Sequence, residues 1–267
     1  MPEPYYLIDA SVYIFRSYFG LPENWYSQNS GHGLSQESHI GQESYPTQAV
    51  YGYLNFLLTL LEAESPNYIA AAFDESLGTC FRNTIYPEYK ANRVLPDAAL
   101  AFQLNACVEV TRLLGVASFA SETYEADDIV GTLAKVGRES DHKIIVITGD
   151  KDLSQLIVSD IETLLKAGER IADLPIRGAK QLPVKIKSYR EQILMSQKLT
   201  VIAEDVPMVG FENLGIQKSG SIGGNSALMR KSIDMDKLSL FCESMGLPDR
   251  FLIRADKISV PQQGCTE

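Results

Sequence analysis

The chain has 267 residues, 45% of them hydrophobic and 22% charged, so it can bury a sizeable core as one large or two smaller globular domains. No apolar run approaches the ~20 residues that cross a membrane, and the N-terminus lacks the basic start and apolar core of a signal peptide. We therefore expect a cytoplasmic protein that has no membrane partner. The net charge of -10 argues against a protein that coats nucleic acid through bulk charge, but local recognition remains compatible with it.

Short apolar runs alternate with helical patterns in the first part of the chain. Apolar residues at helical spacing predict helices over 47–61 and 98–114, and Gly115 is placed to end the second of them. The expected strands occupy residues 5–9, 68–74, 116–119, 143–150 and 161–165. This alternation predicts an α/β fold with a mostly parallel central sheet and helices on both faces.

The remaining segments have a weaker pattern. Residues 22–46 lack periodicity and are expected to form a long surface loop. Beyond residue 166 we expect a helix within 182–199, a low-order stretch over 209–231 and a helix over 234–245. These observations divide the chain into an α/β domain over 1–165 and a reduced helical region over 166–267.

Acidic side chains follow three of the predicted strands and open one helix. The carboxyl ends of parallel strands lie at one edge of a sheet, where ligands bind in α/β proteins. For a single Asp after a strand, capping of a helix is about as plausible as metal binding, and acidic residues in a first turn complement the helix dipole. The whole set favours a metal site, and its members are Asp9, Asp74, Glu125, Asp127, Asp128, Asp150 and Asp152.

Carboxylates this close repel one another, and a hard divalent cation resolves the conflict. Oxygen ligands without a nearby His or Cys favour Mg²⁺ or Mn²⁺ over zinc. The four cysteines are far apart and have no metal-ligand spacing. An ion bound by carboxylates usually serves phosphoryl chemistry, in which it activates a water and stabilises charge on the phosphate.

Cations alternate with aromatic residues between residues 75 and 96, which include Arg82, Tyr86, Tyr89, Lys90 and Arg93. Cations contact phosphates, and tyrosines stack on bases without reading sequence. Taken alone, such a segment is more often a solvated loop. Because it follows the strand that ends in Asp74, we expect it to overhang the acidic edge and to guide a phosphate.

These motifs resemble the 5'-to-3' exonuclease and flap endonuclease family, which includes the N-terminal nuclease domain of bacterial DNA polymerase I. The resemblance covers residues 5 to about 165 in consistent order. The matching segments are Leu7-Ile8-Asp9, Phe73-Asp74, Phe81-Arg82, Tyr89-Lys90-Ala91-Asn92-Arg93, Glu125-Ala126-Asp127-Asp128 and Thr148-Gly149-Asp150-Lys151-Asp152. The resemblance implies a PIN-like 5' nuclease fold that hydrolyses DNA with a free 5' end or flap, and with it a role in DNA repair and replication.

Carried across residue by residue, the resemblance implies that the seven acidic residues form the metal site. It also implies that Arg82, Lys90 and Arg93 clamp the scissile phosphate from a helical arch, with Tyr89 beside them. Arg16 matches a further family position near the DNA. The resemblance gives no indication of protein partners.

The chain departs from the family after residue 165. Family members continue with a Gly-Asp-x-x-Asp-Asn-x-Pro-Gly segment and a helix-three-turn-helix that grips duplex DNA, and these also supply the other aspartates of a second metal site. Here Leu164 to Ala167 is followed almost at once by Ile171 to Lys180, and the sequence from Leu174 to Pro207 resembles the part that follows the missing motif. An internal deletion is the simplest explanation, and it predicts weak or altered activity.

Three functions are compatible with these residues. The first is a metal-dependent nuclease that acts at a DNA 5' end. The second is a degenerate module that binds DNA structures without cleaving them. The third is a Mg²⁺-dependent phosphatase, which would need an Asp nucleophile and a Lys partner.

Overall fold

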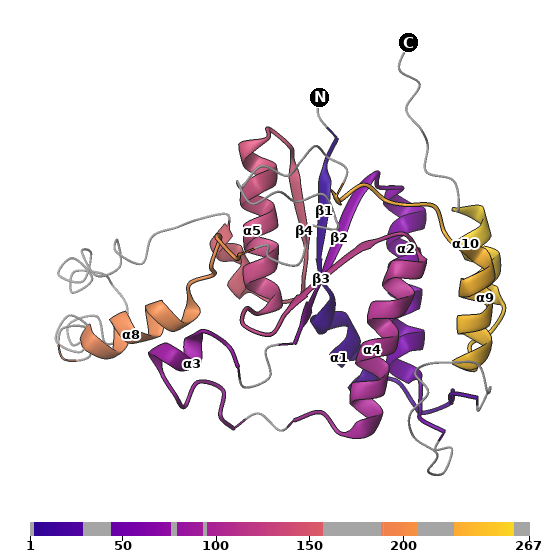
Figure 1. The fold of residues 1–267 in the computed structure, drawn as a ribbon, viewed down its shortest axis with the longest axis horizontal. Helices are drawn as coiled ribbons and strands as arrows, with labels where there is room; N and C mark the ends of the chain where they lie inside the picture. Colours follow the sequence, from indigo (N-terminus) through magenta and orange to yellow (C-terminus); the bar gives the residue numbers. More distant parts are fainter. Residues whose placement is uncertain are drawn as a thin grey trace, which may run out of the picture.

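A computed structural model describes residues 3–28, 44–75, 79–92, 95–156, 188, 190–207 and 227–258. Four strands form one sheet in the order β3-β2-β1-β4, and every neighbouring pair is parallel (Figure 1). The strands are β1 (Tyr5–Asp9), β2 (Tyr68–Asp74), β3 (Ala117–Ser121) and β4 (Ile144–Ile147). The predicted parallel α/β fold is therefore confirmed, although the strand expected over 161–165 lies outside the described residues.

The two central strands, β1 and β2, are buried on both faces, which explains why they are almost continuously apolar in sequence. All five residues of β1 are buried. Because side chains alternate along a strand, Tyr6 and Ile8 pack in one core, whereas Tyr5 and Leu7 pack in another. Strands covered by helices on both faces carry such uninterrupted hydrophobic runs.

One face of the sheet is covered by five helices, α1 (Ala10–Gly20), α2 (Gln48–Glu64), α4 (Ala98–Leu113), α9 (Met235–Ser244) and α10 (Arg250–Lys257). Helix α10 was not predicted, because only Phe251 and Ala255 of its eight residues are buried. It is also held by Arg254, which donates at 2.8 Å to both carboxylate oxygens of Glu62 on α2. The last two helices thus share a hydrophobic core with the N-terminal part of the chain.

The opposite face is covered by α5 (Ala126–Glu139), by the 3-10 helix η1 (Asp152–Leu156) and by residues near 202 and 228. Acidic residues occupy the first turn of α5, and they also cap it as a reciprocal pair that was not predicted from the sequence: Glu125 and Asp128 each accept from the other's backbone N–H. Two further helices, α3 (Arg82–Ile85) and α8 (Arg190–Thr200), lie side by side beyond α5 (Figure 1).

Several expectations reach beyond the described residues. The residues outside the described ranges include most of the loop expected over 22–46 and part of the helix expected within 182–199. They also include most of the stretch 209–231 and the domain division at 165. The short helix α3 within the basic and aromatic segment was not predicted. None of the described helices is both long and apolar enough to span a membrane.

Gly115 ends α4 as predicted, and its conformation is one that side chains disfavour, with φ at +75°. Its carbonyl accepts a 2.9 Å hydrogen bond from the backbone N–H of Lys231. A Cβ at this position would lie 2.0 Å from the carbonyl oxygen of Lys231. This close approach joins the end of α4 to the segment that leads into α9.

Replacing Gly115 by Ala should lower the free energy of unfolding by about 2 kcal/mol or more, because both the backbone angle and the Lys231 contact are lost. The matched control is Gly20→Ala at the end of α1, where a Cβ would meet no atom within 4 Å. The control should be neutral or slightly stabilising. Urea denaturation followed by circular dichroism measures both, and equal stabilities for the two variants would contradict the packing described.

Candidate metal centre

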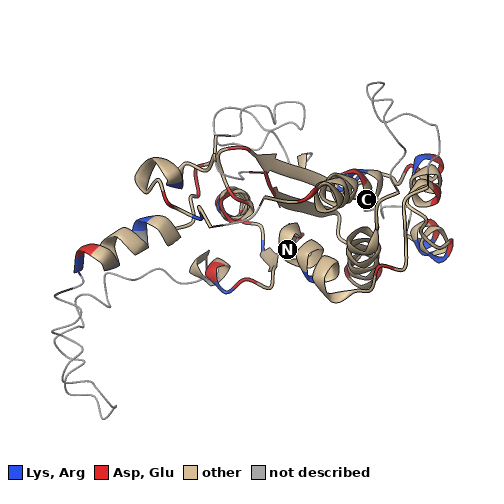
Figure 2. Cartoon of the chain, turned by 90° about the horizontal axis from the view of Figure 1, so that it is seen from below, with Lys and Arg blue, Asp and Glu red and all other residues tan. Residues whose placement is uncertain are grey.

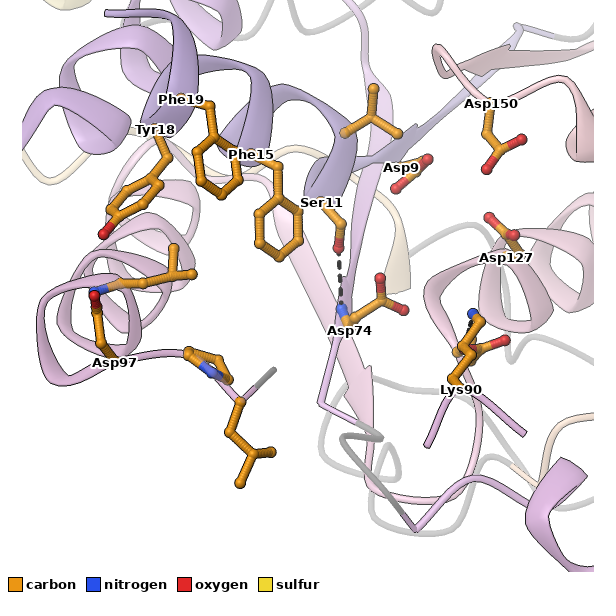
Figure 3. Close-up of a pocket in the computed structure, with 15 residues that line it drawn as sticks. Asp9, Ser11, Phe15, Tyr18, Phe19, Asp74, Lys90, Asp97, Asp127 and Asp150 are labelled. Carbon is orange, nitrogen blue, oxygen red and sulfur yellow. Dashed lines mark hydrogen bonds and ion pairs between the residues drawn. The ribbon is translucent and has the colours of Figure 1, made fainter. Parts of the chain in front are cut away.

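A cavity of about 560 Å³ opens at the carboxyl edge of the sheet, beside the first turn of α5 (Figure 3). One side of it is acidic. The other side is largely apolar and includes Phe15, Tyr18 and Phe19 of α1 together with Leu95 and Leu100 near the start of α4. The acidic side comprises Asp9, Asp74, Glu125, Asp127 and Asp150, and Asp97 lies at the border of the apolar side.

Asp9 ends β1 and is only 3% exposed. The hydroxyl of Thr148, directly after β4, donates to Asp9 Oδ2 at 2.9 Å. Burial, together with the negative charges of Asp74 and Asp150, nevertheless raises the pKa of Asp9 to about 6 against the lowering effect of that hydrogen bond. Asp9 thus lies where the strand order changes direction, between β1 and β4, which is where ligands bind in open α/β sheets.

Asp74 joins the end of β2 to the beginning of α5. Its Oδ1 accepts a 2.8 Å hydrogen bond from the backbone N–H of Ala126, the first residue of that helix. Its own N–H donates to the hydroxyl oxygen of Ser11 at 3.2 Å. Asp74 therefore does both things that the sequence left open as alternatives. Its carboxylate caps the start of α5, and it also lines the cavity.

Asp127 lies in the first turn of α5 and is half-buried. Burial raises its pKa to about 7, and the charges of Asp9, Asp74, Asp150 and Glu125 contribute in that order. All four of these groups also line the cavity. Their combined repulsion means that the acidic side holds protons near neutral pH unless a cation replaces them.

Three donors surround the carboxylate of Glu125. The ammonium of Lys90 donates to Oε1, and the hydroxyl of Tyr89 donates to Oε2 at 3.1 Å. The guanidinium of Arg82 lies 3.3 Å from the same Oε2. The basic and aromatic segment therefore overhangs the acidic edge as expected, and its cations contact Glu125.

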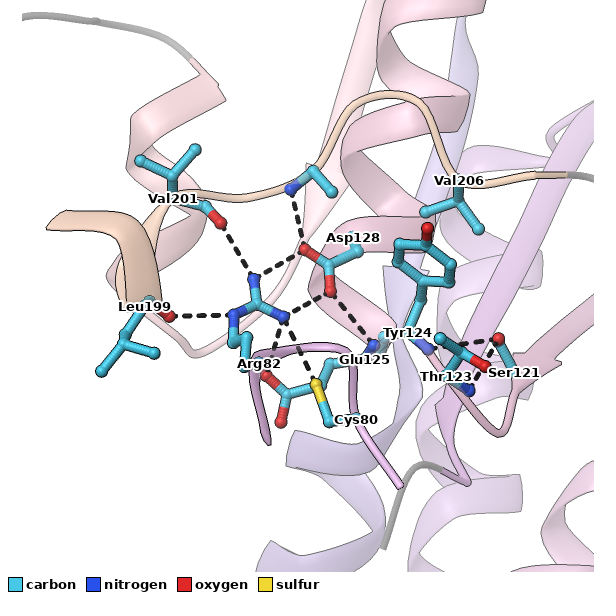
Figure 4. A network of polar contacts seen from close by, with 12 residues as sticks. Cys80, Arg82, Ser121, Thr123, Tyr124, Glu125, Asp128, Leu199, Val201 and Val206 are labelled. Atoms are coloured by element: carbon cyan, nitrogen blue, oxygen red, sulfur yellow. Dashed lines mark hydrogen bonds and ion pairs between the residues drawn. The ribbon is translucent and has the colours of Figure 1, made fainter. Parts of the chain in front are cut away.

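The structure corrects the expected positions of Asp128 and Arg82: neither lines the cavity, and they pair with each other instead, as Figure 4 shows. Asp128 is fully buried and forms a bidentate pair with Arg82 at 2.6 and 2.8 Å. Residues next to each other on a helix point about 100° apart, so Asp127 faces the cavity while Asp128 faces away from it. Arg82 is itself only 2% exposed, which leaves it no direct access to a phosphate.

The other predicted site residues lie at the margin or beyond. Asp150 lines the cavity, and its Oδ1 accepts from the backbone N–H of Asp152 at 2.9 Å. Asp152 begins η1, is exposed and does not line the cavity. Arg16 is exposed on α1 and also lies off the cavity. Arg93 falls outside the described residues.

Sequence reasoning did not identify Ser11, Thr148 or the apolar side of the cavity. Ser11 lies two residues after the end of β1, and Thr148 directly follows β4. Their positions after strands could therefore have indicated that they lie near the site. The apolar side brings together residues about 80 positions apart in sequence, Phe15 and Leu95, and only the folded chain reveals it.

The donor set of the cavity suits a hard cation. Its acidic side offers carboxylate oxygens, whereas Cys80, Cys107 and Cys242 are buried and do not line it. His142 stacks on Tyr5 with ring centroids 4.1 Å apart. Within the described ranges, no three His, Cys, Asp or Glu side chains are already close enough to hold one ion. The cavity therefore suits a cation such as Mg²⁺, which keeps several of its water ligands and contacts one or two carboxylates directly.

Raising the pH should destabilise the metal-free protein. The folded-state pKa values of Asp9 and Asp127, about 6 and about 7, exceed the unfolded value of about 3.9. Stability from such groups is present below the unfolded pKa and is lost as pH rises through the folded pKa. Between about pH 5 and pH 8 the two groups together predict a loss of about 4 kcal/mol, measured by urea denaturation in the presence of a chelator.

Asp127→Asn is the matched variant for this measurement, because it keeps the shape of the side chain and removes its charge. Its stability should fall less over the same pH range. Adding Mg²⁺ at pH 8 should restore stability to the unaltered protein more than to the variant. Identical pH dependences for the two proteins would contradict the assignment of the repulsion to Asp127.

Comparison with known sequences agrees with this geometry. The family described as "5'-3' exonuclease, N-terminal resolvase-like domain" matches residues 4–182. A 5'-3' exonuclease of Aquifex aeolicus is 31% identical over 227 residues, which cover 81% of this chain and 70% of the relative. DNA polymerase I of Mycobacterium bovis is 36% identical over 158 residues, which cover 59% of this chain. The matched region spans only 16% of that polymerase.

Two solved structures resemble the chain at low similarity. The T5 D15 protein co-crystallised with metal ions has 15% identity and a TM-score of 0.42, covering 96% of this chain and 100% of its own. The catalytic core of Rad2 in complex with DNA substrate has 12% identity and a TM-score of 0.45, covering 97% and 92%. The family model matches two thirds of the sequence, and the Aquifex relative is similar over most of both chains. The chain therefore belongs to the 5'-3' exonuclease family, through its N-terminal resolvase-like domain.

Proposed function

We propose that this chain is a divalent-metal-dependent 5'-to-3' exonuclease or flap endonuclease that acts on DNA. One observation carries the proposal: five carboxylates line a single cavity at the carboxyl edge of a parallel sheet in a chain of the 5'-3' exonuclease family. Mg²⁺ or Mn²⁺ is the proposed cofactor. Phosphodiester hydrolysis needs such an ion or an equivalent charge near the phosphate, because the transition state carries additional negative charge on its oxygens.

The proposed ligands are Asp9, Asp74, Glu125, Asp127 and Asp150, which all line the cavity; one or two of them would contact the ion directly, and the others would act through its bound waters. Bound there, it would supply an activated water and stabilise charge on the phosphate. Asp128 is left out of this set, because both of its oxygens are used in the pair with Arg82. Asp152 is not proposed as a ligand, since it does not line the cavity and contacts Asp150 through its backbone N–H.

Among the described residues, Lys90 is the cation that lines the cavity. Its ammonium contacts Glu125, and about a third of its side chain is exposed. A phosphate that enters the cavity meets this ammonium beside the carboxylates, so Lys90 is the proposed phosphate contact. Tyr89 positions the same carboxylate through its hydroxyl. Arg16 and Arg93 remain proposed DNA contacts.

The apolar side of the cavity suits an unpaired base. Phe19 is 77% exposed and Leu95 is 68% exposed, so both present apolar surface to solvent. Exposed aromatic rings stack on bases of any sequence. Figure 2 shows Lys and Arg interspersed with Asp and Glu on the helices, consistent with local DNA contacts rather than attraction by bulk charge.

A second function is favoured by two observations. No three acidic side chains of the described residues are close enough to hold one ion, and the family resemblance implies that the segment with the other aspartates is missing. These features suit a protein that binds flap or nicked DNA without turning it over. Binding without cleavage in the presence of Mg²⁺ and Mn²⁺ would identify this second function.

Cleavage of a DNA flap labelled at its 5' end tests the proposal directly. With Mg²⁺ or Mn²⁺ present, we expect cleavage by the unaltered protein and a loss of at least about 100-fold for Asp127→Ala, because a charged group at the reacting phosphate contributes several kcal/mol. Asp236→Asn, an exposed change on α9, is the matched control and should cleave normally. Equal cleavage by Asp127→Ala and the unaltered protein would exclude the proposed site.

A further inference from the structure

Arg82 makes more internal contacts than any role in direct phosphate binding requires. Its Nη1 and Nη2 donate to the two carboxylate oxygens of Asp128. Its Nε donates to the carbonyl of Leu199 at 2.9 Å, and Nη2 also donates to the carbonyl of Val201 at 2.9 Å. Together with a 3.8 Å contact from Nη1 to the sulfur of Cys80, these bonds use all five N–H groups of the guanidinium.

These contacts connect three elements that are distant in sequence (Figure 4). Arg82 begins α3, Asp128 lies in the first turn of α5, and Leu199 lies in the last turn of α8. The last carbonyls of a helix lack partners within that helix and carry partial negative charge, so a cation there is favourable. Arg82 therefore ends α8 and anchors the beginning of α5 at the same time.

Asp128 extends the same network toward the metal cavity. Its Oδ2 accepts from the backbone N–H of Glu125 at 3.1 Å, and its Oδ1 accepts from the backbone N–H of Ala203 at 2.8 Å. The Arg82 guanidinium also lies 3.3 Å from Glu125 Oε2. Both the backbone and the side chain of Glu125 are thus held by the buried pair.

We infer that Arg82 is a positioning residue, which fixes Glu125 at the cavity and couples the metal site to the segment from Leu199 to Ala203. Arg82 acts through Glu125 and does not touch substrate. The planar guanidinium is required, because a lysine offers a single charged nitrogen and cannot form the bidentate pair while also reaching two carbonyls. The inference rests on the proposed metal site.

Mn²⁺ binding to the purified full chain, measured by calorimetric titration, tests the inference without relying on catalysis. Arg82→Lys keeps the positive charge and removes the fork, and we expect its Mn²⁺ affinity to fall by about 10-fold or more, as when an outer partner of a metal ligand is lost. Circular dichroism establishes that the variant is folded at the titration temperature. Should Arg82→Lys not fold, Asp128→Asn is titrated instead, with the same expected loss.

Thr132→Val is the matched control. Thr132 holds the same segment on α5, since its hydroxyl accepts from the N–H of Val206 at 3.1 Å and contacts the carbonyl of Ala203 at 3.4 Å, with no contact to Glu125. A purely structural role for Arg82 predicts lower stability and unchanged Mn²⁺ affinity in both variants. That result would overturn the inference. Absence of Mn²⁺ binding by the unaltered chain would instead overturn the proposed metal site itself.

Discussion

Repulsion between carboxylates gathered at one edge of a parallel sheet is the constraint on which the rest of this structure depends. Because β1, β2 and β4 all run in the same direction, Asp9, Asp74 and Asp150 reach the same edge as the first turn of α5. Burial removes much of the water that would otherwise screen them. Burial, and then the repulsion from neighbouring carboxylates, raises the pKa values of Asp9 and Asp127.

The surrounding chain offsets part of the repulsion with its own donors. Asp74 accepts from the beginning of α5, Glu125 accepts from Lys90, and Asp128 is neutralised by Arg82. A buried bidentate ion pair is costly to break, because the remaining partner stays buried without a counter-charge. The charge that these donors leave uncompensated is concentrated on Asp9, Asp127 and Asp150, where a divalent cation would be held.

The fold could be predicted largely from sequence because its signals are local. Strand β2 was predicted at its observed bounds, and Gly115 ended α4 as expected, since an apolar run and a glycine act through their own backbone and burial. Helices α3 and α10 were missed. Both are short, and each is held by an arginine that binds a residue far away in the chain. Arg82 of α3 binds Asp128, and Arg254 of α10 binds Glu62.

The amino-acid pattern alone predicts that the carboxylates belong together, because parallel strands that are each followed by Asp bring these side chains to one edge of a sheet. Which members of the set face the cavity depends on how the helices pack. Asp127 and Asp128 are equivalent in the motif, yet a helix turns about 100° per residue, so one lines the cavity and the other pairs with Arg82. Arg82 and Lys90 are likewise both cations after β2, and their burial separates the positioning residue from the proposed phosphate contact.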